Sequence, residues 1–291
     1  MILNVSGRTD IVAFYSKWFM NRYNEGYVDV RNPFYPKLVS RIFFDDVDLI
    51  VFCTKNPLPI LKYLKDIDKS IIFQVTLTPY FKDIEPNVIF KGKIIEGIKE
   101  VSKIIGVSNV YVRYDPIFIN DRYNIDYHIK SFKSLCEKLN GYVKHIIVSF
   151  IDDYKNVRNN MNVLRLKKID DEGYKTIGEN FSKIALEFGM SVQTCFEEKD
   201  LSNYGFIKDV CVSKDLAYKK TGKNFPKWKS RGCGCASMSD IGFYNSCFHL
   251  CKYCYANYDE RKVNDNIKNH DDNSSLLIGH LKEDDIIKIK K

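Results

Sequence analysis

The sequence predicts an α/β fold, specifically a full or partial (β/α) barrel, and two observations carry this prediction. Short apolar runs alternate with amphipathic stretches through the first two thirds of the 291 residues, and polar residues follow the apolar runs. Parallel strands need long crossovers, which helices supply, so this alternation favours a parallel sheet. Six such units before residue 200 fit a barrel better than an open sheet.

The elements follow from period and from the residues that end each run. Strands are expected at Ile2–Val5, Leu49–Cys53, Ile71–Leu77, Val110–Tyr114, Ile146–Phe150 and Val192–Phe196, with further candidates at Gly205–Val212 and Ser239–Tyr244. Helices are expected over Ala13–Tyr23, from Pro57, and over Ile94–Ile105, Ile129–Leu139 and Tyr174–Phe188. Gly106 and Gly189 end two of these helices, and Pro57 permits only a helix start.

Length and composition bound the domain organisation and the class of protein. We expect a barrel body over residues 1–212, a basic and cysteine-rich segment over 213–258 that completes the barrel, and a polar tail over 259–291 that wraps it. The 45% hydrophobic and 28% charged composition is that of a globular protein. No apolar stretch reaches transmembrane length, and the first ten residues lack the pattern of an export signal. We therefore expect a cytoplasmic protein without a membrane partner.

The excess of positive charge is concentrated in one segment. Residues 214–231 hold seven basic residues and one acidic residue, with Tyr218, Phe225 and Trp228 interleaved. This composition is compatible with a phosphate-bearing partner such as a nucleic acid. A solvated lysine-rich loop is the alternative.

Polar residues follow the strand ends, where a (β/α) barrel carries its chemistry. These positions hold Arg8, Asp10, Lys55, Asn56, Thr76, Thr78, Arg113, Asp115, Ser149, Asp152 and Glu197. One such residue alone is usually a loop cap, but six strand ends that all carry them favour a site. The sequence lacks a Ser-His-Asp order, a glycine-rich phosphate-binding loop and an HExxH stretch, which disfavours hydrolytic chemistry.

Three of the nine cysteines form a compact motif. Cys247, Cys251 and Cys254 lie at i, i+4 and i+7, where each thiolate can bind one iron of a [4Fe–4S] cluster. The fourth iron is then open to another ligand. Structural zinc usually takes four protein ligands, so three cysteines fit it poorly. His249 could complete a zinc site, but we expect the turn to aim it away.

Four other cysteines form a candidate second metal site. Cys195, Cys211, Cys233 and Cys235 are expected near neighbouring strand ends, where they could bind a second [4Fe–4S] cluster or a zinc ion. The alternative for Cys195 and Cys211 is a pair of buried apolar thiols. The remaining two, Cys53 and Cys136, are expected in the core.

The C-x3-C-x2-C motif with an aromatic residue before its third cysteine, here Tyr253, resembles the cluster motif of the radical S-adenosylmethionine (SAM) superfamily. The resemblance implies that the open iron chelates the amino and carboxylate groups of SAM. It also implies that reduction of the cluster cleaves SAM and releases a 5′-deoxyadenosyl radical. In that superfamily the motif follows the first barrel strand, whereas here it begins at residue 247.

Nearly the whole chain resembles the DUF1848 family of bacteria and archaea. The matching stretches are Ser6 to Ile11, Ala13 to Ser16, Arg31 to Pro33, Thr54 to Pro57, Arg113 to Pro116 and Asp240 to Gly242. Cys53 departs from the pattern, since relatives are expected to carry tryptophan there. The resemblance implies fold and cofactor but little about substrate.

A permuted barrel accounts for the late position of the motif. A barrel is cyclic, so Ser239–Tyr244 can take the place of the usual first strand beside Ile2–Val5. The loop after the latter would then bind SAM through Ser6, Gly7, Arg8 and Asp10, and Tyr253 would pack near the adenine. Gly7 permits close approach of the backbone.

The leading expectation is a radical SAM-like enzyme that receives electrons from a donor such as flavodoxin or ferredoxin. Arg113, Asp115 and Lys55 are the candidate catalytic residues, and Asn56 and Thr76 are further candidates for cofactor binding. Two alternatives stay open: a nucleic-acid repair or modification factor with the same cluster, and a non-catalytic iron–sulfur or zinc protein.

Overall fold

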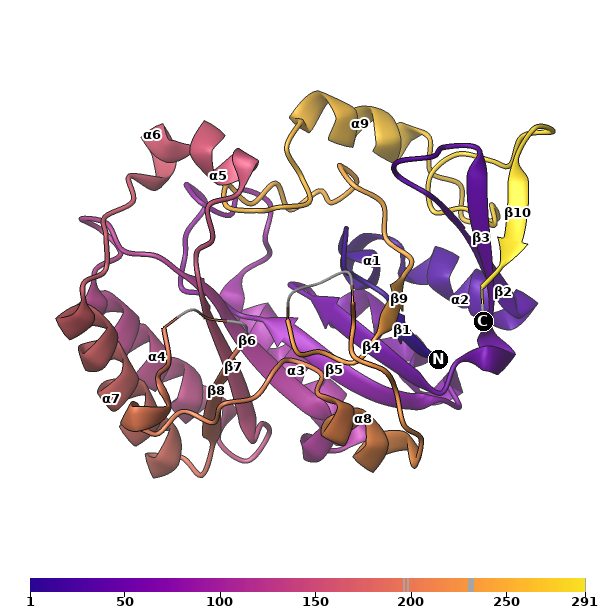
Figure 1. Ribbon diagram of the computed structural model, residues 1–291. Helices are drawn as coiled ribbons and strands as arrows, with labels where there is room; N and C mark the ends of the chain where they lie inside the picture. Colours follow the sequence, from indigo (N-terminus) through magenta and orange to yellow (C-terminus); the bar gives the residue numbers. More distant parts are fainter. Residues whose placement is uncertain (196, 198, 230–232, 291) are drawn as a thin grey trace.

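The computed structural model describes residues 1–195, 197, 199–229 and 233–290, and its centre is a parallel sheet of seven strands (Figure 1). In spatial order these are β8 (Ser191–Thr194), β7 (His145–Phe150), β6 (Val110–Ile117), β5 (Ser70–Thr76), β4 (Leu49–Thr54), β1 (Ile2–Asn4) and β9 (Met238–Asp240). All neighbours pair in parallel. The expected parallel α/β fold is therefore confirmed.

Helices cover the outer face of this sheet. They are α1 (Ile11–Phe14), α2 (Ser16–Glu25), α3 (Lys91–Ile105), α4 (Ile125–Leu139), α7 (Asp171–Glu187) and the 3₁₀ helix η2 (Leu58–Asp66). On α3, Ile94, Ile98 and Val101 recur at helical spacing and are buried in the main core, which explains why the pattern was readable from sequence. The expected helix over Ala13–Tyr23 is two helices, because Tyr15 between them has a non-helical backbone.

The inner face of the sheet is covered by the connection between β8 and β9. Alternate residues of a strand face opposite sides, so Ile50 of β4 belongs to the outer core and Val51 to a second apolar cluster on the inner side. That second cluster includes Val212 and Ala217 of the connection. Within the described residues, the connection between β8 and β9 contains one α-helix, α8 (Lys214–Thr221).

The expected strand at Gly205–Val212 is wrong. Only Ile207 makes a bridge there, to Gln193. The carbonyls of Val210 and Cys211 accept hydrogen bonds from the side chains of Gln193 and Gln74 instead, at 3.1 and 3.0 Å. Side-chain amides thus take the acceptors that a strand would offer to its neighbour.

The edges of the sheet bear on the expected barrel. Strands β8 and β9 are its two ends and do not pair with each other in the described part of the chain, so a closed barrel is not shown. Strand β9 does lie beside β1, in a register that pairs Met238 with Ile2 and Asp240 with Asn4. Phe196, the expected end of the sixth strand, lies outside the described residues.

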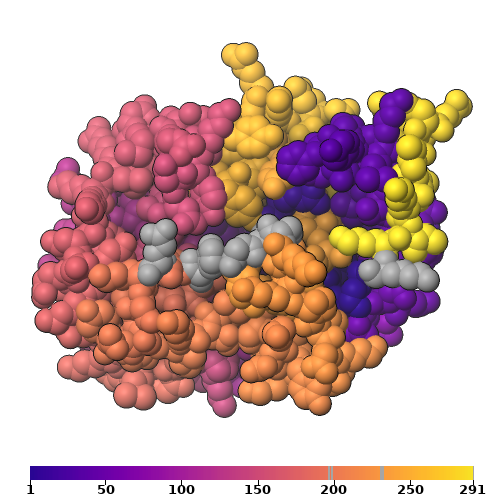
Figure 2. All heavy atoms as spheres, viewed as in Figure 1, coloured from indigo at the N-terminus to yellow at the C-terminus, as the bar shows by residue number. Residues whose placement is uncertain are grey.

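The C-terminal tail packs against the N-terminal part of the chain, as Figure 2 shows in gold and yellow beside indigo. It contains α9 (Glu260–Lys268) and β10 (Ile286–Ile289), which joins β3 (Leu38–Phe43) and β2 (Tyr27–Arg31) in a small sheet. The Trp18 indole donates to the carbonyl of Ser274 at 2.8 Å. The remaining short elements are α5 (Lys155–Asn159), α6 (Met161–Leu164), η1 (Phe44–Asp46), η3 (Val107–Asn109) and η4 (Ser202–Tyr204).

Within the described residues, none of the helices has both the length and the apolar character that crossing a membrane requires.

One buried histidine gives a test of the packing between α4 and β6. His128 is fully buried, with Nδ1 3.0 Å from the Tyr114 hydroxyl and Nε2 2.9 Å from the carbonyl of Phe118. Burial disfavours the charged imidazolium and lowers the pKa of His128 to about 4. The unfolded chain, with a histidine pKa near 6.5, then binds more protons than the folded chain between these two values, and stability falls as the pH is lowered through that window.

We therefore expect the wild type to lose about 2 kcal/mol of unfolding free energy through His128 between pH 7 and pH 4.5. A His128→Gln variant should lack this part of the loss, measured by urea denaturation at the two pH values. His280→Gln, which replaces a histidine with a 67% exposed side chain, is the control and should retain the wild-type pH dependence. Equal pH dependence of the His128→Gln variant and the wild type would contradict the assignment.

A cysteine-lined candidate active site

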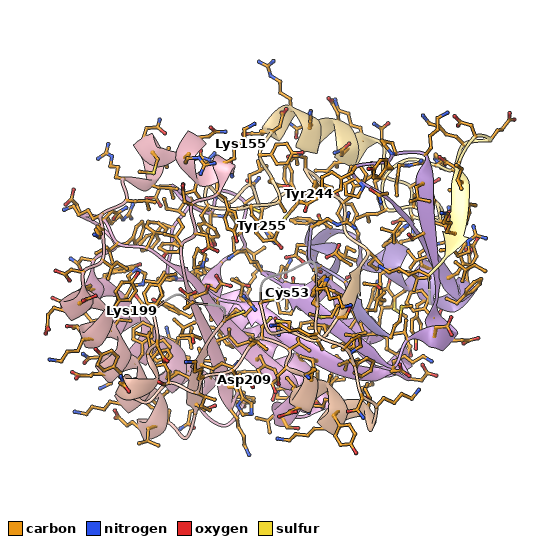
Figure 3. The ribbon with its side chains drawn as sticks, viewed as in Figure 1. Cys53, Lys155, Lys199, Asp209, Tyr244 and Tyr255 are labelled. Atoms are coloured by element: carbon orange, nitrogen blue, oxygen red, sulfur yellow. The ribbon has the colours of Figure 1, made fainter. Side chains whose placement is uncertain are left out.

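A cavity of about 600 Å³ lies at the carboxyl end of the central sheet. Strand ends supply Asn4, Cys53, Thr54, Thr76, Arg113, Asp115 and Ser149 to its lining. Eight of the nine cysteines line it, namely Cys53, Cys195, Cys211, Cys233, Cys235, Cys247, Cys251 and Cys254. The expectation that Cys53 sits in the core is thus wrong, whereas Cys136 is fully buried on α4 as expected. Figure 3 places Cys53 near the middle of the molecule, with Tyr244 and Tyr255 above it.

The cysteine motif forms one wall of this cavity. Cys247, Cys251 and Cys254 lie on the loop that follows β9, and the first two are buried. Burial raises the pKa of all three thiols, and the neighbouring thiols raise those of Cys247 and Cys251 further. The Cys254 sulfur accepts the Ala256 N–H at 3.3 Å. The positive charge of Lys55 opposes this rise in pKa at Cys251 and Cys254. Three thiols are a donor set suited to a metal that replaces their protons.

A single metal ion and an iron–sulfur cluster place different demands on these three thiols. Across the described ranges, no three His, Cys, Asp or Glu side chains are grouped so that they could hold one metal ion. A [4Fe–4S] cluster has a different demand, because each thiolate binds a different iron. Three cysteines on one loop can offer one thiolate to each of three irons.

Asp10 links the cysteine loop to the carboxyl ends of strands β1 and β4. Its Oδ2 accepts from the Thr54 hydroxyl at 3.0 Å and the Lys55 N–H at 2.8 Å, and His249 Nε2 lies 2.9 Å away. Its Oδ1 accepts the Ala13 N–H and caps α1. His249 was expected to point away from the site, but it lines the cavity, and its Nδ1 is buried without a partner in the described chain. Asp10 could bind an ammonium group only by sharing oxygens that are already engaged.

The rest of the loop after β1 is shaped by a close approach to β9. A Cβ on Gly7 would lie 1.6 Å from Asp240 Oδ2, so only glycine fits. Arg8 does not line the cavity; its Nε donates to Asp240 Oδ1 at 2.9 Å. Ser6 does line it, and its buried hydroxyl has no hydrogen-bond partner among the described residues. Ser6 and Gly7 therefore face the cavity, while Arg8 holds two strands together.

A buried carboxylate that the sequence analysis missed, Glu85, contacts the cysteine loop through Tyr253. Glu85 accepts from Lys55 Nζ at 2.8 Å and from the Thr78 hydroxyl at 2.6 Å, and it also contacts Lys91 and the Tyr253 hydroxyl. Burial alone would raise the pKa of Glu85, but the two lysines outweigh it and lower the pKa to about 2. The ammonium of Lys55 also lies 5.4 Å from the Tyr253 ring centroid. Lys55 and Tyr253 are thus fixed at the cavity wall by one carboxylate.

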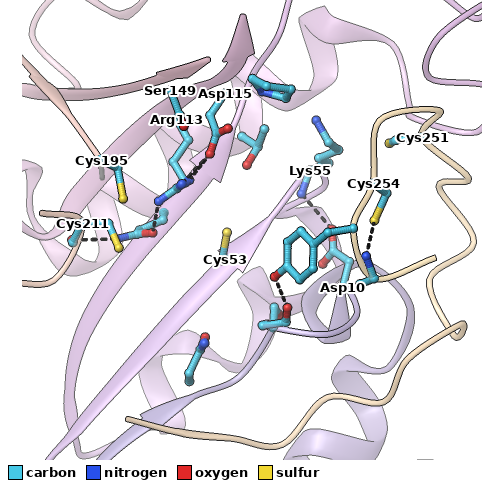
Figure 4. A pocket seen from close by; sticks show the side chains of 18 of the residues that line it. Asp10, Cys53, Lys55, Arg113, Asp115, Ser149, Cys195, Cys211, Cys251 and Cys254 are labelled. Atoms are coloured by element: carbon cyan, nitrogen blue, oxygen red, sulfur yellow. Dashed lines mark hydrogen bonds and ion pairs between the residues drawn. The ribbon is translucent and has the colours of Figure 1, made fainter. Parts of the chain in front are cut away.

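Arg113 stands on the opposite side of the cavity, beside Cys195 and Cys211 (Figure 4). Its guanidinium donates to the Asp115 carboxylate and, at 3.2 Å, to Gln74 Oε1. Burial disfavours charge on Arg113, but Asp115 and the nearby thiols outweigh this effect and raise its pKa well above the usual value. The site therefore has a basic group near each set of cysteines.

Two further expected residues divide between the cavity and the fold. Thr76 lines the cavity at the end of β5. Asn56 does not line it; its Oδ1 accepts the Leu58 N–H at 3.2 Å and so starts η2. Gln74 was missed, although a polar residue inside the apolar run Ile71–Leu77 was a readable signal. Glu85 offered none, because it lies well past the strand end in a long loop.

The buried carboxylate allows a matched test. Glu85→Gln would leave Lys55 and Lys91 without their counter-charge, and we expect it to lower the unfolding free energy by about 3 kcal/mol. Glu100→Gln, in an exposed pair with Lys103 on α3, should change it far less, because solvent screens exposed pairs. Chemical denaturation measures both. Similar costs for the two variants would show that Glu85 does not neutralise a buried pair of lysines.

Comparisons with known proteins bear on the family. No curated protein matches the chain at the significance required. One crystal structure that matches is described as a putative alpha-L-fucosidase from Bacteroides thetaiotaomicron. It is 11% identical, the match covers 69% of this chain and 76% of that chain, and the TM-score of 0.29 is too low to support any conclusion. The family model described as "Domain of unknown function (DUF1848)" matches residues 2–256, and the chain therefore belongs to the DUF1848 family.

Proposed function

We propose that the protein is a radical SAM-like enzyme in which Cys247, Cys251 and Cys254 bind a [4Fe–4S] cluster. The observation that carries this proposal is the position of the three thiols. They line a cavity at the carboxyl end of a parallel sheet, on the loop directly after β9, and β9 pairs with β1. This is the relation between motif and strand that a permuted radical SAM-type barrel requires.

Together with SAM and an electron from a donor such as flavodoxin or ferredoxin, such a cluster supplies a 5′-deoxyadenosyl radical. The chain's own residues would hold and shield the reactants. Ser6 offers the methionine part of SAM a hydroxyl that has no partner among the described residues, and Gly7 lies beside it in the cavity lining. Tyr253, held by Glu85, offers a ring face to the adenine. Arg8 acts indirectly, because it fixes Asp240 and so keeps this loop beside β9.

The opposite wall is the proposed place for the substrate. Arg113 and Asp115 are polar and partly accessible from the cavity, with side chains 14% and 23% exposed. Thr76 and Ser149 lie on the neighbouring strands at the same level. A substrate between these strand ends and the cysteine loop would be held away from bulk water, which radical chemistry requires.

The proposal predicts a specific pattern of metal loss. Anaerobically purified wild type should contain iron and sulfide, and its cluster should absorb at about 400 nm. After reduction it should form 5′-deoxyadenosine from SAM. Cys251→Ala should lose about four irons per chain and all 5′-deoxyadenosine formation. Cys136→Ala, which removes a buried thiol outside the cavity, is the matched control and should retain both.

Two outcomes would count against the proposal in different ways. Retention of iron and SAM cleavage by Cys251→Ala would refute the ligand assignment. A wild type that binds iron and sulfide but forms no 5′-deoxyadenosine would indicate a non-catalytic iron–sulfur protein.

A further inference from the structure

A second set of thiols lies across the cavity from the cysteine motif. It comprises Cys195, which follows β8, Cys211 in the connection to β9, and Cys233 and Cys235 just before β9. The sulfurs of Cys211 and Cys235 are 3.3 Å apart, and the Cys195 thiol is close enough to both to interact with them electrostatically. Segments distant in sequence thus bring their sulfurs to one place.

Simple packing does not explain this arrangement. The carbonyl of Cys211 is held by Gln74 at 3.0 Å, and the carbonyl of Cys235 accepts the Trp228 N–H at 2.9 Å. The backbone on both sides of the sulfur pair is therefore fixed by specific hydrogen bonds. A disulfide does not explain it either, since its S–S bond is about 2.05 Å long and all nine cysteines are free thiols.

Metal binds the ionised form of sulfur, and a basic side chain lies beside this second set of thiols (Figure 4). The buried guanidinium of Arg113 is attracted to Cys195 and Cys211. A cluster of thiolates would repel one another without a cation, and Arg113 neutralises only one of them.

We propose that Cys195, Cys211, Cys233 and Cys235 bind a second thiolate-ligated metal centre, either a [4Fe–4S] cluster or a zinc ion. Both take four cysteine thiolates. Around tetrahedral zinc the sulfurs are about 3.8 Å apart, given Zn–S bonds of about 2.3 Å, and around a cluster they are further apart. The four thiols as placed do not surround one point, so binding requires side-chain rotation in either case. With four protein ligands this centre has no coordination position open to a substrate, unlike the proposed cluster at Cys247, Cys251 and Cys254.

The experiment separates the two centres by removing the first. The triple variant Cys247→Ala/Cys251→Ala/Cys254→Ala is purified anaerobically, and its iron, sulfide and zinc are measured per chain. We expect about four irons with sulfide, or about one zinc ion, to remain. Absorbance near about 400 nm accompanies the cluster and not zinc, so the two metals are told apart. Adding Cys211→Ala and Cys235→Ala to the triple variant should abolish the remaining metal, whereas adding Cys136→Ala should not.

Three results would overturn the second centre. The triple variant could hold neither metal even after reconstitution with iron and sulfide or with zinc. Its metal could persist after Cys211 and Cys235 are replaced. Mass spectrometry of anaerobically prepared wild type could find a disulfide between these two cysteines. Because these readouts use metal content and thiol state, they stay informative even if the wild type forms no 5′-deoxyadenosine.

Discussion

The parallel pairing of β9 with β1 is the constraint on which the site depends. It brings a loop near residue 250 beside a loop near residue 8, and three contacts then join them. Arg8 Nε donates to Asp240 Oδ1 at 2.9 Å, and Gly7 leaves room for that carboxylate. The Tyr255 hydroxyl donates to the Gly7 carbonyl, and Asp10 meets His249. Without this ladder the cysteine motif would have no fixed position relative to the strand ends.

The cavity combines many thiols with few charges, and two basic residues of its lining are each paired with a carboxylate. Lys55 is matched by Glu85 on one side, and Arg113 by Asp115 on the other. Burial raises the pKa of Cys247 and Cys251 and so favours their protonated form. A polypeptide that only packed its core would bury apolar side chains here instead, since buried ion pairs add little stability over apolar packing. The polar lining is therefore better explained by binding than by folding.

Elements with a clear apolar periodicity in their own residues were predicted from the sequence. Elements and side-chain contacts that depend on segments distant in the chain were not. The six strands of the sheet and helix α3 follow from local apolar patterns, and β9 beside β1 follows from the cyclic order of a barrel. Strand β10 was missed because its partner β3 lies about 250 positions earlier in the chain. Strands β2 and β3 were also missed, although they are neighbours in the chain and pair antiparallel; their burial does not alternate strictly, so the strand period is weak in their residues. Likewise, Glu85 and His249 acquire their place in the site only when loops from different strands meet.

The basic segment shows how far charge in a sequence can lie from the chemistry it suggests. Lys220 contacts Asn109 and Ser108, just before β6, and Lys223 pairs with Asp48, just before β4. These lysines therefore lie at the amino ends of the strands, whereas the cavity lies at the carboxyl ends. β4 has six residues, so the two edges are roughly 20 Å apart. Arg231 lies outside the described residues, and nucleic-acid binding stays a prediction. A nucleic acid whose phosphates contact Lys220 and Lys223 would lie at the amino ends of the strands, away from Cys251. A nucleic-acid substrate would instead have to bind at the carboxyl ends, where the cavity lies.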